Sequence, residues 1–477
     1  MRWGSGGACR YVVLLALFAG LEAAAQQSSN GEMRGMPMPA ATTPPQAAMV
    51  MPANRSAGML LQQSSGTDVQ PQSWAMPQLM QQVGGWQLMW MGQAFAVDVQ
   101  QRPLPANPSE TPANGEPTGS DKVYSTNWGM LAAVHSLGPG AVMLRSMLSL
   151  EPATVSDRRY PELFQTGETA YGVPIVNGQH PHNFVMEMAA EIAEPLYKDI
   201  LGYIYYAPVG DPALGPTAYP HRASAAELPQ AALGHHYEDS THIADNVATV
   251  GVEDRWLRLE ASGFYGQEPG ENRWTLKIGG MDSWAARMVF SPVIGGVQGL
   301  TAQISTGRLT HPEAASPGDE ERTTASVEYV RSIGEESWAS SLIWGRDYKT
   351  DGRYAVNALT AETVFPVGRR NLITGRYEWS QRDELFDYDP ALKQQLAAEG
   401  HRWFDVSAFT GGYTRVVGNL RNAEIGIGAN ATGYYVPDAL RPYYGKYPFG
   451  VSAYVRARLK PKHAMRMEKM DMAMHSH

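Results

Sequence analysis

The residues best suited to chemistry lie in the last fifteen positions of the chain, which contain five methionines and three histidines. The candidate metal ligands there are Met465, Met467, Met470, Met472, Met474, His475 and His477. Methionine thioethers are soft ligands that select Cu(I), while imidazole suits Cu(II), Zn²⁺ and Ni²⁺. Exposed methionine is also easily oxidised, so its abundance here calls for a functional reason. The pattern therefore favours metal capture over a tail of incidental composition.

A second methionine-rich segment lies near the N-terminus. Residues 26–85 are rich in Gln, Pro, Ala, Ser and Met, a composition that predicts a disordered tail. Met33 precedes Met36 and Met38, which repeat the Met-x-Met spacing of the C-terminal segment. Two flexible tails with soft ligands predict a shared role in metal binding, and a plain linker is the alternative.

Histidines also gather in two long connecting segments, 151–182 and 208–242. His235, His236 and His242, together with Asp239, could supply imidazole and carboxylate ligands to a borderline metal. The alternative, which we favour, is that these side chains form hydrogen bonds that hold folded loops over a barrel mouth. Proline and glycine in residues 207–216 indicate an ordered loop that could enter the lumen.

Catalysis is the other chemistry to consider, because Ser240 lies close to these histidines. A serine nucleophile needs an oriented base, and no nucleophile elbow or triad can be recognised around it. The sequence therefore predicts that the protein is not an enzyme.

The elements that carry these residues are strands. From Trp86 to Leu459, segments of about ten residues alternate apolar and polar side chains, as in a strand with two different faces. About sixteen such segments predict an all-β fold, a transmembrane antiparallel barrel over residues 86–460. The residues expected to face lipid include Leu257, Leu259, Ile373, Val451, Ala453 and Val455.

The opposite face of the strands is charged and should line the lumen. The residues expected to point inward include Arg258, Glu260, Glu328, Glu362, Arg376, Glu378, Asp405, Glu424, Arg456 and Arg458. Acids and arginines side by side predict salt-bridged walls and weak ion selectivity. If the long loops fold inward, the pore should be nearly closed.

The joins between the strands are alternately short and long. Outer-membrane barrels have short periplasmic turns and long outer loops, so this alternation predicts that both termini are periplasmic. Residues 461–477 then form a tail beyond the last strand.

The first 25 residues and the composition support export. Arg2 and Arg10 precede an apolar run over 11–21, and alanines 23–25 form a cleavage site, as in a signal peptide. The single cysteine, Cys9, lies in this segment, so the mature chain would have no thiol chemistry. The net charge of −9 over 477 residues argues against a nucleic-acid partner.

Two motifs, at 171–182 (YGVPIVNGQHPH) and 233–242 (LGHHYEDSTH), are similar to segments of an uncharacterised family of bacterial exported β-barrel proteins. This resemblance covers about residues 120–460 and implies fold and location only. The order of signal peptide, methionine-rich tail and barrel also resembles the outer-membrane copper resistance protein B family in architecture and composition. The chain departs from that family in its second tail and its histidine-bearing loops.

The expected function is therefore an outer-membrane barrel whose periplasmic tails bind copper or another soft metal, in metal tolerance or efflux. The expected partners are outer-membrane lipid and metal ions or small solutes, and homo-oligomerisation is left open. Two alternatives remain: a porin-like channel for small solutes with incidental tails, and a structural outer-membrane protein.

Overall fold

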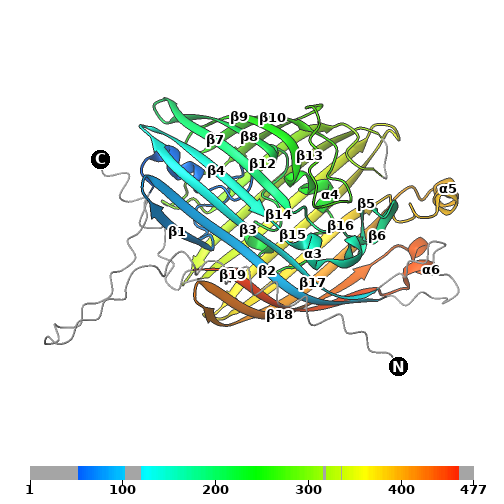
Figure 1. Cartoon of the computed structure of the whole chain (residues 1–477). Coiled ribbons are helices and arrows are strands. Elements are labelled where there is room, and N and C mark those ends of the chain that lie inside the picture. The colour runs from blue at the N-terminus through cyan, green and yellow to red at the C-terminus, as the bar shows by residue number, and fades with distance from the viewer. Residues whose placement is uncertain (1–51, 103–119, 315–317, 335, 461–477) are drawn as a thin grey trace. The chain divides into compact units, whose positions relative to one another are not determined.

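The described residues form a closed antiparallel β-barrel of sixteen strands, as predicted (Figure 1). The computed structural model describes residues 52–102, 120–314, 318–334 and 336–460. Each strand pairs with the next along the wall. The strands are β2 (Trp86–Arg102), β3 (Asp121–Leu137), β4 (Gly140–Leu148), β7 (Val185–Tyr197), β8 (Ile200–Gly210), β9 (Ala244–Glu253), β10 (Leu257–Tyr265), β11 (Ser283–Phe290), β12 (Leu300–Leu309), β13 (Glu320–Ile333), β14 (Glu336–Lys349), β15 (Tyr354–Val367), β16 (Asn371–Arg382), β17 (Phe404–Leu420), β18 (Ala423–Tyr435) and β19 (Phe449–Leu459).

The barrel closes where the last strand meets the first. β19 pairs with the second half of β2, from Phe449 opposite Arg102 to Arg458 opposite Gln93. The short strand β1 (Gln78–Val83) pairs with the first half of β2, over 86–91. Every backbone hydrogen-bonding edge of β2 is thus used, as a bilayer requires.

The two faces of the wall differ as the alternation predicts. Leu257, Leu259, Ile373, Val451 and Val455 are 40–49% exposed on the outer face, and Ala453 is exposed beside them. The predicted inward side chains of arginine and glutamate are all buried. An apolar exterior around a polar interior is the architecture of an outer-membrane barrel.

Asp405 is the exception, because it is exposed rather than inward. At this end of β17 the inward positions are Phe404 and Val406, which pack against Leu385 and Phe386 of the preceding loop. This apolar cluster reverses the usual pattern of polar side chains inside, so alternation places Asp405 outside. The prediction for Asp405 was wrong.

The connections are short at one end of the barrel and mostly longer at the other. The short-turn end includes residues 138–139, 198–199, 368–370 and 421–422. One long connection, 149–184, contains a separate two-stranded sheet, β5 (Tyr160–Ala170) and β6 (Val173–Gln179), which the sequence analysis did not predict.

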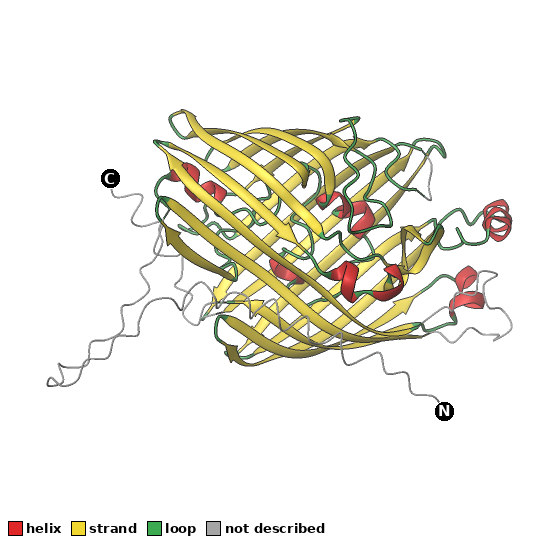
Figure 2. Ribbon diagram, in the orientation of Figure 1, coloured by secondary structure: helices red, strands yellow, loops and turns green. Residues whose placement is uncertain are grey.

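The helices are few and short against the strands of the wall (Figure 2). They are α2 (Arg55–Leu60), α3 (Glu151–Thr154), α4 (His235–Glu238), α5 (Pro390–Ala398) and α6 (Arg441–Tyr444), with 3₁₀ turns η2 (Ser156–Arg158), η3 (Ala223–Ala225), η4 (Ser240–His242) and η5 (Asp438–Leu440). None in the described part of the chain is long and apolar enough to cross a membrane.

The N-terminal region differs from the expected disordered tail. Residues 26–51 lie outside the described residues, but residues 52–85 contain α2 and β1 and bury most of the side chains of 56–71. Its composition resembles that of a linker, yet Met59, Leu60 and Leu61 pack into an apolar cluster with wall residues of β3, β4 and β7. The barrel supplies the apolar surface that the segment alone lacks.

Candidate functional site

The lumen is filled by three segments of the chain itself: residues 52–77, 149–184 and 211–243. In each segment at least half of the residues are buried. Four cavities lined by residues of these segments and of the wall measure about 20–50 Å³, room for a few water molecules at most. The candidate site is therefore a filled lumen. The contacts that attach the three segments to the wall determine what this lumen can do.

The N-terminal segment crosses the short-turn end of the barrel. The Asn54 side-chain amide donates to the carbonyl oxygens of Gly138 and Gly140 at 3.0 and 2.9 Å, in the turn between β3 and β4. Further along, Ser73 donates its hydroxyl to the carbonyl of Val330 on β13 at 2.6 Å. The segment thus bridges two distant parts of the wall.

Buried ion pairs hold the middle of this segment. Arg145 on β4 pairs with Glu187 on β7 at 2.7 Å, and both side chains are almost fully buried. Arg145 also donates to the carbonyl of Gly66, whose own N–H donates to Glu187 at 3.2 Å. The hydroxyl of Ser65 donates to Asp211 at 3.1 Å, which joins the segment to the second long loop.

The loop at 211–243 is bound to the opposite wall by charged groups. Arg222 pairs with Glu362 on β15 at 2.7 Å and with Asp239 of its own loop at 2.8 Å. Glu227 pairs with both Arg456 and Arg458 on β19. The predicted salt-bridged walls are present, and many of their partners are loop residues rather than wall residues alone.

Six histidines of the two long loops lie buried or nearly buried in this filled lumen: His180, His182, His221, His235, His236 and His242. Five of these rings, all but that of His221, form a chain of contacts. The ring centroids of His235 are 5.4 Å from those of both His236 and His242, and those of His182 and His242 are 5.3 Å apart. His180 lies 5.6 Å from His236.

The predicted ligand set does not converge on one metal position. Asp239 is engaged by the ring of His235 at 2.6 Å and by Arg222. The Nδ1 of His242 bonds to the backbone oxygen of Asp239 at 2.8 Å. Burial tends to raise the pKa of the Asp239 carboxyl, but His235 and Arg222 together hold this pKa below its usual range. These contacts support the favoured interpretation of loop-holding hydrogen bonds for His235 and His242.

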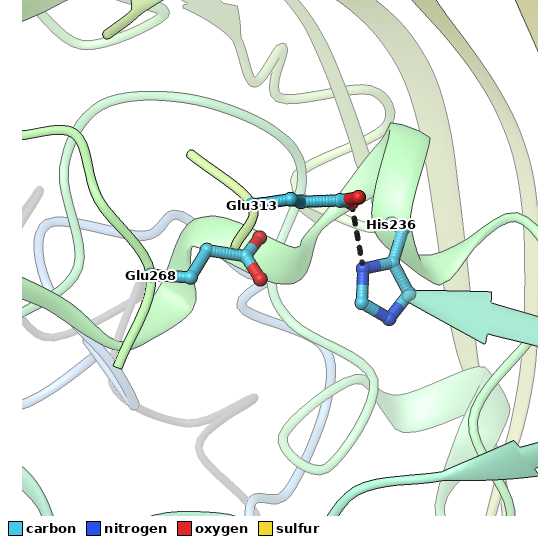
Figure 3. Close-up of side chains that lie close together, drawn as sticks. All are labelled: His236, Glu268 and Glu313. Carbon is cyan, nitrogen blue, oxygen red and sulfur yellow. Dashed lines mark ion pairs between the residues drawn. The ribbon is translucent and has the colours of Figure 1, made fainter. Parts of the chain in front are cut away.

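His236 has different neighbours from the other two predicted ligands. Its ring lies beside Glu268 of the β10–β11 loop and Glu313 of the β12–β13 loop (Figure 3). One ligand atom from each of the three side chains lies within 4.8 Å of the others. Neither ring nitrogen of His236 has a hydrogen-bond partner among the described residues.

Burial shifts the pKa values of all three side chains, His236, Glu268 and Glu313. Burial, followed by the electrostatic influence of the neighbouring His235, lowers the pKa of the His236 imidazole well below its usual value. Burial raises the pKa of Glu268 to about 7, against the effect of Arg322. Burial and the nearby Glu384 raise the pKa of Glu313 well above its usual value. His236 is therefore neutral at pH 7, which is its metal-binding form.

Ser240 lacks the contacts of a catalytic nucleophile. Its hydroxyl accepts a hydrogen bond from Arg322 at 2.8 Å and lies 3.3 Å from the carbonyl oxygen of His236 and 3.4 Å from Glu268. In the described structure no imidazole ring is hydrogen-bonded to Ser240, so these contacts assign it a loop-holding role.

Sequence reasoning missed Glu268 and Glu313. Each is an acidic residue in a connection without a recognisable motif, and only the folding of separate loops into one lumen brings them to His236. The predicted tail ligands lie outside the described residues: Met33, Met36, Met38, Met465, Met467, Met470, Met472, Met474, His475 and His477.

No protein-family model matches the chain, and no curated protein matches it. Solved structures that are similar include OprB of Pseudomonas putida, with 10% identity over 78% of this chain and 94% of that one and a TM-score of 0.48. An anion-selective porin from Comamonas acidovorans is 11% identical over 78% of this chain and 100% of its own, with a TM-score of 0.47. The outer membrane channel DcaP of Acinetobacter baumannii is 9% identical over 80% of this chain and 99% of its own, with a TM-score of 0.42. The resemblance to the copper resistance protein B family stays a prediction.

Proposed function

We propose that this protein is an outer-membrane channel for small polar solutes, and that its own N-terminal segment and loops close it. The observation that carries this proposal is the charged inner wall of a sixteen-stranded barrel, covered by chain segments that attach through ion pairs and hydrogen bonds. A barrel of this size can enclose an aqueous channel. Polar attachments can be exchanged for water when a segment leaves the wall, whereas the apolar contacts of Met59, Leu60 and Leu61 hold that part of the N-terminal segment in place.

The test locks one of these segments in place. The hydroxyl of Ser224 in η3 donates to that of Ser341 on β14 at 2.9 Å, so cysteines at these two positions would bring their sulfur atoms close together, as a disulfide requires. In planar bilayers, the wild type should be mostly closed with intermittent openings. The oxidised Ser224→Cys/Ser341→Cys variant should lose most openings, and reduction should restore them.

Two further variants complete the experiment. Ser224→Cys alone is the matched control and should conduct like the wild type under both redox conditions. Arg222→Ala removes the ion pairs to Glu362 and Asp239 and should increase the open fraction several-fold. A steady open pore in the wild type that the disulfide leaves unchanged would contradict the proposal.

A second candidate function is copper handling by the methionine- and histidine-rich tails. The observation in its favour is the set of six histidines inside the lumen, because imidazole is also a ligand for copper. Flexible thioether ligands exchange readily, which suits handover rather than storage.

Deletion of residues 26–51 and 461–477 tests this second function. The deletion should lower growth in excess copper and reduce the Cu(I) bound by the purified protein. Unchanged copper tolerance, together with no Cu(I) uptake by the intact chain, would reject the copper function and leave the channel as the only proposed function.

A further inference from the structure

We propose that His236, Glu268 and Glu313 form a site for a borderline divalent cation such as Zn²⁺, and that this cation ties three loops together inside the barrel. The inference does not depend on conduction or on the tails. It starts from the position of three potential ligands on three separate connections, which meet with their ligand atoms within 4.8 Å of one another (Figure 3).

The backbone already holds two of these connections together. The N–H of Glu268 donates to the carbonyl oxygen of Pro312 at 2.9 Å, immediately before Glu313. The Nδ1 of His236 lies 3.6 Å from the Oε1 of Glu313. A metal bonded at 2.0–2.2 Å in tetrahedral geometry needs ligand atoms about 3.4 Å apart, so one pair already fits. The Glu268 side chain has three rotatable bonds that allow the remaining approach.

The hydrogen bonding of the three side chains is incomplete. His236 is 2% exposed and Glu313 is 5% exposed. Both nitrogens of His236, and the Oε2 atoms of Glu268 and Glu313, are buried without a hydrogen-bond partner among the described residues. Buried polar atoms in native proteins are normally paired, and an unpaired one is costly. A cation bound by one ring nitrogen of His236 and by both carboxylates would give three of these four atoms a partner.

The charges around the three side chains also favour a bound cation. Arg322 and Lys349 are the permanent cations that act on Glu268 and Glu313. Arg322 is engaged by Asp347 at 2.8 Å, and Lys349 by Glu320 and Glu384 at 2.5 and 3.3 Å. Within the described part of the chain, neither Glu268 nor Glu313 has an arginine or lysine within 4.0 Å. Two carboxyl groups without a positive partner balance the charge of one divalent ion once that ion displaces their protons.

The ligand types indicate the class of cation. One imidazole nitrogen with two carboxylate oxygens is a borderline-to-hard set that suits Zn²⁺, Mn²⁺ or Fe²⁺. It contains no sulfur, which Cu(I) prefers. This site therefore differs in preference from the methionine-rich tails.

The test measures metal bound to the full-length protein in detergent. After removal of metal with a chelator, the protein is loaded with Zn²⁺ or Co²⁺, desalted and assayed for metal per barrel and for the visible absorption of bound Co²⁺. The comparison variant is Glu268→Gln/Glu313→Gln, which keeps side-chain shape. The matched control is Glu162→Gln, a buried glutamate on β5 whose Oε2 also lacks a hydrogen-bond partner.

The wild type and the Glu162→Gln control should each retain one more equivalent of Zn²⁺ than the double variant, because the tails contribute equally to all three. Zn²⁺ should also raise the unfolding temperature of the wild type and the control, and leave that of the double variant unchanged. Heat-modifiable migration on gels reports whether each barrel is folded. Equal metal content in the wild type and the double variant would overturn the proposal, as would a wild type whose unfolding temperature does not respond to Zn²⁺.

Discussion

At the scale of single residues, buried charge pairs decide where the chain segments inside the barrel lie. Arg145 and Glu187 are both wall residues, yet each also bonds to the backbone of Gly66 in the N-terminal segment. A buried pair contributes little net stability, but breaking it leaves a charge without compensation. Such pairs therefore specify the position of a segment more than they stabilise the barrel.

Substitution of Arg145 by Ala should release the N-terminal segment. It leaves the Glu187 carboxylate buried and unpaired, and should lower the free energy of unfolding by about 3–5 kcal/mol. Denaturant unfolding and protease sensitivity of residues 60–75 measure the effect. Arg255→Ala is the control, because its pair with Asp199 is exposed and should cost less than about 1 kcal/mol. Equal losses in the two variants would contradict the assigned role.

Asp211 should make the joint between the N-terminal segment and the second loop sensitive to pH. Burial raises the pKa of its carboxyl to about 8, above the value of about 4 in an unfolded chain. Its contribution to stability is therefore full below about pH 4 and is lost as pH rises through about 8. Between pH 6 and pH 8 the loss should be on the order of 2 kcal/mol.

Asp211→Asn removes the titration while its side-chain oxygen can still accept from Ser65. Thermal unfolding from pH 5 to pH 9 should show a steeper decline for the wild type than for this variant. Parallel curves would show that Asp211 does not titrate in this range.

At the scale of elements, each strand has one face on the outside of the barrel and one face toward the lumen. Along β19, Val451 and Val455 are exposed on the outer face, while Ser452, Tyr454 and Arg456 are buried inside. The strand period of two is sufficient to place both sets. Whether an inner position carries a charged or an apolar side chain, however, matches the loop that covers it. Phe404 is an apolar inner residue, and the loop packed against it is apolar too.

A charge on the outer face should be costly in proportion to its depth. Val455 is 47% exposed in the middle of β19, and Val455→Arg should destabilise the folded barrel by about 2–4 kcal/mol in lipid. Tyr435→Arg, at the long-loop end of β18, is the matched control and should cost about 0–1 kcal/mol. Unfolding from lipid vesicles measures both, and equal costs would place the bilayer elsewhere on the wall.

At the scale of the whole molecule, the sorting of connections by length sets the orientation that we propose. The described chain begins and ends at the short-turn end, where Asn54 contacts the β3–β4 turn and the N–H of Lys460 donates to the carbonyl of Asn422 at 2.8 Å. We expect this end to face the periplasm, because outer-membrane barrels keep their short turns there.

Single-cysteine labelling tests the orientation, because the only natural cysteine is Cys9. Gln394→Cys on the exposed α5 should react with a membrane-impermeant maleimide on intact cells. Arg369→Cys, in the β15–β16 turn, should react only after the outer membrane is opened. If only the Arg369→Cys variant were labelled on intact cells, the orientation would be the opposite of the one that we propose.

The sequence by itself determined the wall of this barrel. The alternation of residues 255–263 and 451–459 assigned lipid and lumen faces correctly, because side-chain direction in a strand depends only on position along it. The sixteen strands were predicted for the same reason, and the short turns followed from their spacing. Asp405 was misassigned because an apolar cluster that includes Leu385 and Phe386 of the preceding loop occupies the inner face there.

Only the tertiary structure decided what fills the barrel. Residues 52–85 resemble a linker in composition, and their folding depends on an apolar surface and on charged partners that the wall provides, such as Arg145. The group of His236, Glu268 and Glu313 has no local pattern, because its members come from three connections separated by whole strands. Local periodicity carries no information about such contacts, since they form only when the closed wall brings the loops into one confined volume.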